Sequence, residues 1–138
     1  MNVRKRMQTD VVTLQADEPV INAVEATSSE RIRHLPVLEG EQLVGMVSDR
    51  DIKHALPSPL TGQNEQEYKK ILNETPVSRI MRSAPITATP YATMAQIVRL
   101  MMEHKIGAIP IVERATLVGI ITEQDVLQAF LEVLELLE

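Results

Sequence analysis

The amino-acid sequence repeats itself at an offset of 74 residues. Residues 3–55 align with residues 77–129 without a gap, and twelve of these 53 aligned pairs are identical. A gapless internal repeat of this length indicates one supersecondary unit that is used twice. Two copies are too few for a solenoid. We therefore predict two repeats that pack face to face with pseudo-twofold symmetry, and we look for function in the cleft between them.

Both repeats show the same order of predicted elements: an extended segment, an amphipathic helix, two strands joined by a short turn, and a closing helix. The extended segments are residues 11–14 and 85–88. The hairpin strands are residues 35–38, 43–48, 109–112 and 117–121. The first hairpin turn contains Gly40 and the second has no glycine, so we expect their geometries to differ. The order β-α-β-β-α, present twice, indicates an α+β fold.

The helices are predicted from apolar residues at helical spacing. The second repeat carries such a face at positions i, i+3, i+4 and i+7, formed by Met94, Ile97, Val98 and Met101. The closing helices begin at Ser48 and Thr122. The second of them is apolar on more than one face, which is typical of a helix that is buried or meets a partner. We predict a homodimer through these helices, including Met94, Met101, Phe130 and Leu134.

Residues 1–56 and 77–138 form the two predicted repeats, and residues 57–76 form a linker between them. The linker opens on Pro57-Ser58-Pro59 and contains Gly62, residues that interrupt helices and strands. Its middle part, residues 65–72, is rich in helix formers and is predicted to form a short helix.

The composition argues against several classes of function. The net charge is −5, and the chain has one Phe, two Tyr and no Trp, so a basic or base-stacking nucleic-acid surface is not expected. There is no cysteine for a disulfide or thiolate, and no histidine pair at metal-ligand spacing. No apolar run reaches the roughly 18 to 20 residues of a membrane-spanning helix. We expect a cytoplasmic protein that binds neither nucleic acid, membrane nor metal.

The strongest local signal is the motif Gly-Met-Val-Ser-Asp-Arg-Asp at residues 45–51, with its copy Gly-Ile-Ile-Thr-Glu-Gln-Asp at residues 119–125. A hydroxyl followed three residues later by an acid, where a strand meets a helix, is close to a capping box. The same geometry can bind a ligand. A helix N-terminus with a hydroxyl can hold a phosphate, and an Asp one turn further can accept hydrogen bonds from ribose hydroxyls.

With their flanking segments, these motifs resemble tandem CBS domains, the Bateman module. The resemblance rests on His-Leu-Pro-Val-Leu…Leu-Val-Gly-Met-Val-Ser-Asp-Arg-Asp-Ile and on Ala-Ile-Pro-Ile-Val…Leu-Val-Gly-Ile-Ile-Thr-Glu-Gln-Asp-Val, and it covers nearly the whole chain. The first motif and the linker resemble CBS proteins of the acetoin-utilisation type, without the further C-terminal domain that many of those carry. The resemblance implies binding of an adenosyl ligand: AMP, ADP, ATP or S-adenosylmethionine.

The resemblance also implies roles for individual residues. The carboxylates would hold the ribose and the hydroxyls would lie near the phosphates, at Ser48 and Asp51 in one site and at Thr122 and Asp125 in the other. The extended segment of the opposite repeat would wall in the adenine. This pairing assigns Val11, Val12 and Thr13 to the Asp125 site, and Pro85, Ile86 and Thr87 to the Asp51 site.

Arg33 and His34 precede the proline of the first repeat, where the second repeat has Gly107 and Ala108. Family members often place basic residues here against ligand phosphates, and an arginine can bind phosphate in a forked geometry. The alternative is that Arg33 is solvated and His34 is structural. As ligand contacts, they would make one site bind phosphates better than the other.

Three functions are therefore compared. The leading hypothesis is a non-catalytic sensor in which an adenosyl ligand biases a two-state dimer that reports to a separate protein effector. The second is a ligand-free dimerisation module whose Ser/Thr-x-x-Asp motifs are only helix caps. The third, a small enzyme, lacks a Walker-type loop, a Ser-His-Asp order and a metal cluster. We predict no catalytic residue and no cofactor besides the regulatory ligand.

Overall fold

The computed structural model describes residues 1–29, 32–56 and 64–138. The chain divides into two compact units, and each is named here after the motif carboxylate that it contains. The Asp51 unit is Val12–Pro85, and the Asp125 unit is Met1–Val11 together with Ile86–Glu138. Residues 1–11 begin the first repeat but belong to the unit that contains residues 86–138 of the second. Residues 77–85 begin the second repeat but belong to the unit that contains residues 12–56 of the first. We call residues 1–11 and 77–85 the exchanged segments.

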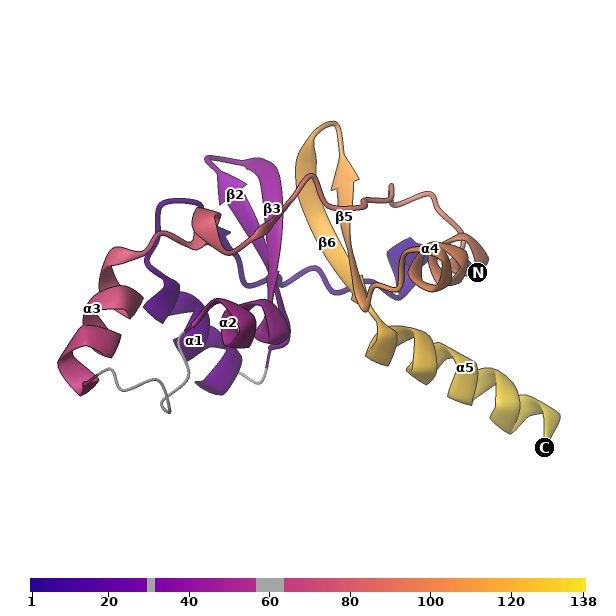
Figure 1. Ribbon diagram of the computed structural model, residues 1–138. Helices are drawn as coiled ribbons and strands as arrows, with labels where there is room; N and C mark the ends of the chain where they lie inside the picture. The colour runs from indigo at the N-terminus through magenta and orange to yellow at the C-terminus, as the bar shows by residue number, and fades with distance from the viewer. Residues whose placement is uncertain (30–31, 57–63) are drawn as a thin grey trace. The chain divides into compact units, whose positions relative to one another are not determined.

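The Asp51 unit contains a sheet in the order β1-β2-β3-β4, in which β1 is parallel to β2 and the other pairs are antiparallel. Its strands are β1 (Leu14–Gln15), β2 (His34–Glu39), β3 (Gln42–Ser48) and β4 (Arg82–Ser83). Its helices are α1 (Val20–Ser29), α2 (Asp49–Ala55) and α3 (Glu65–Glu74), followed by the short 3-10 helix η3 (Val77–Arg79). Helices α1 and α2 contact one another and lie together beside the β2–β3 hairpin (Figure 1).

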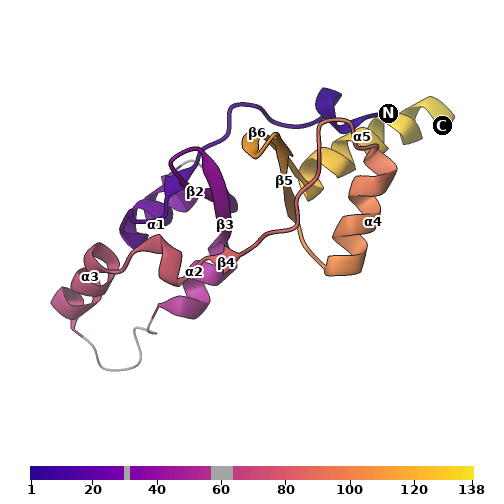
Figure 2. The same cartoon turned by 90° about the horizontal axis from the view of Figure 1, so that it is seen from above.

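The Asp125 unit is built around one antiparallel hairpin. Its elements are η1 (Val3–Lys5), α4 (Met94–His104), β5 (Ala108–Glu113), β6 (Thr116–Thr122) and α5 (Glu123–Leu137). Isolated bridges add Gln8 to β6 at Ile120 and Ala88 to β5 at Ile111. Helices α4 and α5 both contact this hairpin (Figure 2).

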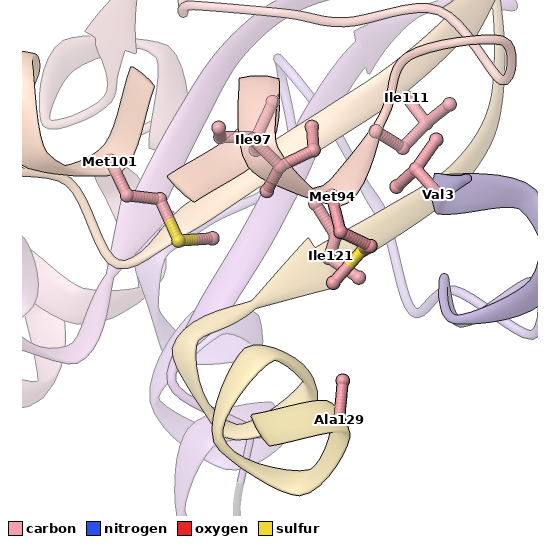
Figure 3. Close-up of a cluster of buried hydrophobic side chains, with 8 residues drawn as sticks. Val3, Met94, Ile97, Met101, Ile111, Ile121 and Ala129 are labelled. Carbon is pink, nitrogen blue, oxygen red and sulfur yellow. The ribbon is translucent and has the colours of Figure 1, made fainter. Parts of the chain in front are cut away.

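Each unit has its own apolar core, and each core includes a valine from the exchanged segment. Val3 is fully buried in the Asp125 unit and Val77 is fully buried in the Asp51 unit. These two valines are an identical pair of the internal repeat. In Figure 3, Val3 lies in the same cluster as Ile111 and Met94. Burial of the valine anchors the exchanged segment to its unit through the hydrophobic effect.

The burial of α4 corrects one prediction. Met94 and Met101 are each only 8% exposed and pack in the core with Ile97, so their assignment to a dimer contact is wrong. They lie on the face of α4 that covers the hairpin, where flexible methionine side chains fill the space between helix and strands. The helical spacing predicted an apolar face correctly, but it could not indicate which surface that face covers.

Most predicted elements are confirmed, with small shifts at their ends. The α+β fold, both hairpins and the helix within residues 65–72 are present. The first predicted extended segment forms a strand only from Leu14, and the second makes a single bridge at Ala88. The prolines and glycine predicted to break the linker lie within residues 57–63, outside the described residues.

The two hairpin turns differ, as their sequences predicted. Gly40 has a φ of 62° and begins the two-residue turn between β2 and β3. In the β5–β6 turn, Arg114 and Ala115 both have positive φ values, of 51° and 66°. A positive φ at the first position only is typical of type II′ turns, and positive values at both positions are typical of type I′ turns.

Candidate functional site

The closing helix α2 begins with a capping box. The Ser48 hydroxyl accepts a hydrogen bond from the Asp51 backbone N–H at 3.0 Å, and the Ser48 backbone N–H donates to Asp51 Oδ2 at 2.9 Å. Two backbone donors that the helix itself cannot satisfy are thereby paired. One carboxylate oxygen of Asp51 is committed to the fold.

The second closing helix repeats this arrangement. The Thr122 backbone N–H donates to Asp125 Oδ2 at 2.8 Å, and the Asp125 backbone N–H reaches the Thr122 hydroxyl at 3.4 Å. The Thr122 hydroxyl itself donates to Asp125 Oδ2 at 3.0 Å. Both motifs therefore act as helix caps, so capping is part of their role whether or not they also bind a ligand.

The other carboxylate oxygen faces a side chain that is distant in sequence. Arg82 Nε donates to Asp51 Oδ1 at 3.1 Å, and Gln8 Nε2 donates to Asp125 Oδ1 at 3.2 Å and to its Oδ2 at 3.1 Å. Gln8 and Arg82 occupy aligned positions of the internal repeat. Each belongs to the exchanged segment of its unit. The carboxylate is thus held on one side by the helix cap and on the other by a long polar side chain.

Sequence reasoning did not identify Gln8 or Arg82. They are separated from their carboxylates by 117 and 31 residues, and Gln and Arg do not look like equivalent residues. A signal was nevertheless present. Each follows directly after a methionine of the identical pair Met7 and Met81. The repeat alignment therefore marks Gln8 and Arg82 as equivalent positions beside a shared residue.

The motif glycines explain why these segments can approach the strands. A Cβ added to Gly119 would lie 2.8 Å from the Gln8 carbonyl oxygen and 2.8 Å from Met7 Sδ. A Cβ added to Gly45 would meet Met81 Sδ and would lie 3.0 Å from the Arg82 carbonyl oxygen. Such distances are shorter than van der Waals contact, so only glycine lets the backbone that carries Gln8 or Arg82 lie against β6 or β3.

The two carboxylates differ in their electrostatic surroundings. The Asp51 side chain is 13% exposed and forms an ion pair with Arg82, whose side chain is 64% exposed. Because Arg82 is mostly in water, the pair contributes little to stability. Its larger consequence is the local charge. Asp51 and Arg82 together are neutral, whereas Asp125 and Gln8 together carry one negative charge.

Arg33 and His34 lie next to the Asp51 motif. His34 pairs with Ser48 across the β2–β3 hairpin, and the Arg33 carbonyl oxygen accepts from the Asp49 N–H at 3.0 Å. Gly107 and Ala108 hold the aligned positions beside Thr122, where the Glu123 N–H donates to the Gly107 carbonyl oxygen at 2.9 Å. The positively charged residues Arg33 and Arg82, together with His34, therefore belong to the Asp51 unit, and their aligned counterparts in the Asp125 unit are uncharged.

The predicted adenine walls are divided between the units. Val11 belongs to the Asp125 unit, and residues 12–13 belong to the Asp51 unit. Pro85 belongs to the Asp51 unit, and residues 86–87 belong to the Asp125 unit. The contacts of residues 11–13 and 85–87 with a base stay predictions.

A second polar cluster lies away from both motifs. The Tyr91 hydroxyl donates to Glu113 Oε1 at 2.7 Å, and the Arg4 guanidinium lies 5.5 Å from the centre of the Tyr91 ring. The hydrogen bond to Glu113 and the charge of that carboxylate raise the pKa of Tyr91, with a smaller opposing effect from Arg4. Arg4 and Tyr91 are exposed, and Glu113 is partly exposed.

Two further properties bear on function. Among residues 1–29, 32–56 and 64–138, no group of three or more His, Cys, Asp and Glu side chains could hold a metal ion. In the same part of the chain, no helix combines the length and the apolar character needed to cross a bilayer.

Comparison with known proteins identifies relatives along the whole chain. A model of the CBS domain matches twice, at residues 3–58 and 77–132. The CBS domain-containing protein YhcV of Bacillus subtilis is 31% identical over 124 residues, covering 90% of this chain and 81% of that protein. The two matched ranges correspond to the two repeats.

Solved structures agree with this match. A crystal structure assigned to an acetoin utilization protein, AcuB, of Vibrio cholerae has a TM-score of 0.80 at 30% identity, covering 99% of this chain and 94% of that chain. The crystal structure of CBSX2 in complex with AMP has a TM-score of 0.79, covering 96% of this chain and 97% of that chain. At 24% identity, the likeness to CBSX2 shows the fold alone.

Proposed function

Because the chain belongs to the CBS domain family and carries two CBS domains, we propose that it is a non-catalytic regulatory module that binds adenosyl ligands. One observation carries this proposal. In each unit, an Asp beside a helix N-terminus uses one oxygen for the helix cap and turns the other toward a polar side chain from a distant segment. The cap alone does not require that second contact.

The proposed ligand is a molecule that contains adenosine. Asp51 Oδ1 and Asp125 Oδ1 would accept hydrogen bonds from the ribose hydroxyls, replacing those from Arg82 and Gln8. Ser48 and Thr122 would lie near the 5′ substituent, and residues 11–13 and 85–87 would contact the base. CBSX2, which has the same fold, was crystallised with AMP, and this supports the choice of ligand class.

The regulatory part of the proposal concerns α5. Its exposed residues include large apolar side chains, with Leu127 at 60% and Phe130 at 56% exposed. Single exposed apolar residues are common on protein surfaces, but several on one helix mark an interaction surface. We assign this face, with Phe130 and Leu134, to a homodimer that reports ligand binding to a protein effector in the cytoplasm. Coupling of about 1–3 kcal/mol would change the effector's affinity several-fold to a hundred-fold.

The alternative is a dimerisation module that binds no ligand. The two complete capping boxes favour it, because they account for the repeated Ser/Thr-x-x-Asp motif without any ligand. The two functions differ in what happens when the acid becomes an amide. An Asn can still accept the hydrogen bond of the cap through its oxygen, but its NH₂ group cannot accept one from ribose.

Calorimetric titration with AMP, ADP, ATP and S-adenosylmethionine tests the proposal. We expect saturable binding by at least one of them, and a loss of at least about tenfold in affinity at the changed site in Asp51→Asn or Asp125→Asn. Asp49→Asn and Glu123→Gln are the matched controls, since they change an acid in the same first helical turn outside the capping box. Absence of binding by all four ligands in a folded protein would favour the dimerisation module.

A further inference from the structure

The residue that faces each motif carboxylate is the main chemical difference between the two candidate sites. Arg82 and Gln8 are aligned in the repeat, follow the identical methionines, and lie on backbone that passes close to a motif glycine. Both donate a hydrogen bond to Oδ1 of their Asp. The two side chains are therefore placed alike against their carboxylates, but Arg82 is charged and Gln8 is not.

A ribose hydroxyl that binds Asp51 Oδ1 must compete with Arg82. The guanidinium has five N–H donors, and the Nε–H is the one that donates to Asp51 at 3.1 Å. A ligand without an anionic group would take the carboxylate and leave Arg82 without a counter-ion. A ligand with a phosphate offers Arg82 a second anion, and guanidinium binds phosphate in a forked geometry with charge-assisted hydrogen bonds.

The situation at Asp125 is different. Gln8 is uncharged, so a ribose can displace its amide without separating an ion pair. A phosphate at this site would meet an uncompensated carboxylate, because Gln8 contributes no positive charge and Gly107 and Ala108 stand where the first repeat has Arg33 and His34. Like charges held close together disfavour binding.

We propose that Arg82 is a specificity-determining residue that makes the Asp51 site selective for adenosyl ligands with a phosphate, and that Gln8 removes this selectivity from the Asp125 site. The inference rests on the proposed function and extends it. Arg82 acts as an exchangeable counter-ion, paired with Asp51 before binding and with the ligand phosphate afterwards. The Asp125 site accepts adenosyl ligands that carry no phosphate.

Reciprocal exchange of the two residues tests this role. Adenosine and AMP share the base and ribose and differ only in the phosphate, so the ratio of their affinities measures phosphate selectivity. Each site is measured separately by calorimetry in the Asp125→Asn or the Asp51→Asn background. In the first background, Arg82→Gln should lower the preference for AMP over adenosine at the Asp51 site about tenfold. In the second, Gln8→Arg should raise that preference at the Asp125 site by a similar factor.

Two matched variants separate this role from a general effect of charge or folding. Arg79→Gln removes the same charge three residues away and should leave the preference unchanged. Arg82→Lys keeps the charge but not the planar fork, and should retain part of the preference. A raised salt concentration should reduce the AMP preference in the wild-type protein and have less effect on Arg82→Gln.

The outcomes distinguish this inference from the proposed function. If adenosine and AMP bind the wild-type protein but Arg82→Gln leaves their affinity ratio unchanged, the role of Arg82 is overturned and the proposed function stands. If neither binds the folded wild-type protein, the role of Arg82 is overturned, and the proposed function is overturned as well if ADP, ATP and S-adenosylmethionine also fail to bind. If Arg79→Gln lowers the ratio of AMP to adenosine affinity as much as Arg82→Gln does, the specific role of Arg82 is also overturned, because the effect would then be one of total charge.

Discussion

The Asp51 unit and the Asp125 unit are built on the same plan from aligned residues. In each, an exchanged segment brings a valine into the core and a methionine against a motif glycine, and a capping box holds the motif Asp. The units differ in the side chain that donates a hydrogen bond to Oδ1 of the motif Asp, which is Arg82 in the Asp51 unit and Gln8 in the Asp125 unit. The valines, methionines, glycines and aspartates of this shared plan are identical between the repeats, whereas Gln8 and Arg82, which face the carboxylates, are not. The comparison teaches that packing restricts the first group and leaves the second free to diverge.

The largest expected effects come from the motif glycines. We expect Gly119→Ala to lower the free energy of unfolding by about 2–3 kcal/mol, because the new methyl group would lie 2.8 Å from a backbone oxygen that cannot easily move. Gly45→Ala should cost less, about 1–2 kcal/mol, because its shortest contact is with the flexible end of Met81. Urea denaturation followed by circular dichroism measures both.

A double substitution sharpens this comparison. Met81→Ala should remove most of the additional cost of Gly45→Ala, whereas Met7→Ala should not rescue Gly119→Ala, since the Gln8 carbonyl oxygen remains. Equal destabilisation by both glycine substitutions, with equal rescue, would mean that the two segments approach their strands in the same way.

The hairpin turns should respond in opposite directions. Gly40→Ala should destabilise the protein by about 1 kcal/mol, since nothing crowds this position and the cost is that of a positive φ. Ala115→Gly should stabilise it by about 0.5–1 kcal/mol, because it relieves the same strain in the other turn. Thermal and urea unfolding provide the measurement. Ala95→Gly, on the exposed face of α4, is the control and should destabilise. A loss of stability in Ala115→Gly would refute the strain argument.

The smallest effect concerns the surface cluster of Arg4, Tyr91 and Glu113 in the Asp125 unit. Because Glu113 raises the pKa of Tyr91, Glu113→Gln should bring this pKa down toward its ordinary value of 10.0. Ultraviolet titration in a Tyr68→Phe background follows Tyr91 alone. Glu39→Gln changes the aligned residue of the first repeat and should have no effect, since Asp17 stands there in place of Tyr91. An unchanged Tyr91 pKa in Glu113→Gln would contradict the assigned hydrogen bond.

The sequence by itself determined the family, the repeated order of strands and helices, and the Ser48 and Thr122 helix caps. These features depend on residues close together in the chain: alternation along a strand, apolar spacing along a helix, and a hydroxyl three residues before an acid. Even the difference between the two turns followed from the presence of Gly40 in one and the absence of glycine in the other. Local stereochemistry is encoded locally, so a short stretch of sequence is enough to predict it.

Only the tertiary structure decided which segments belong together and what each carboxylate faces. The exchange of Val3 and Val77 between cores, the burial of Met94 and Met101, and the contacts of Gln8 and Arg82 arise between residues far apart in the chain. An apolar residue can be buried against several alternative surfaces, and a polar one can be solvated or paired. The choice between them is made by the packing of the whole unit, because burial and hydrogen bonding depend on which atoms the fold brings within contact distance.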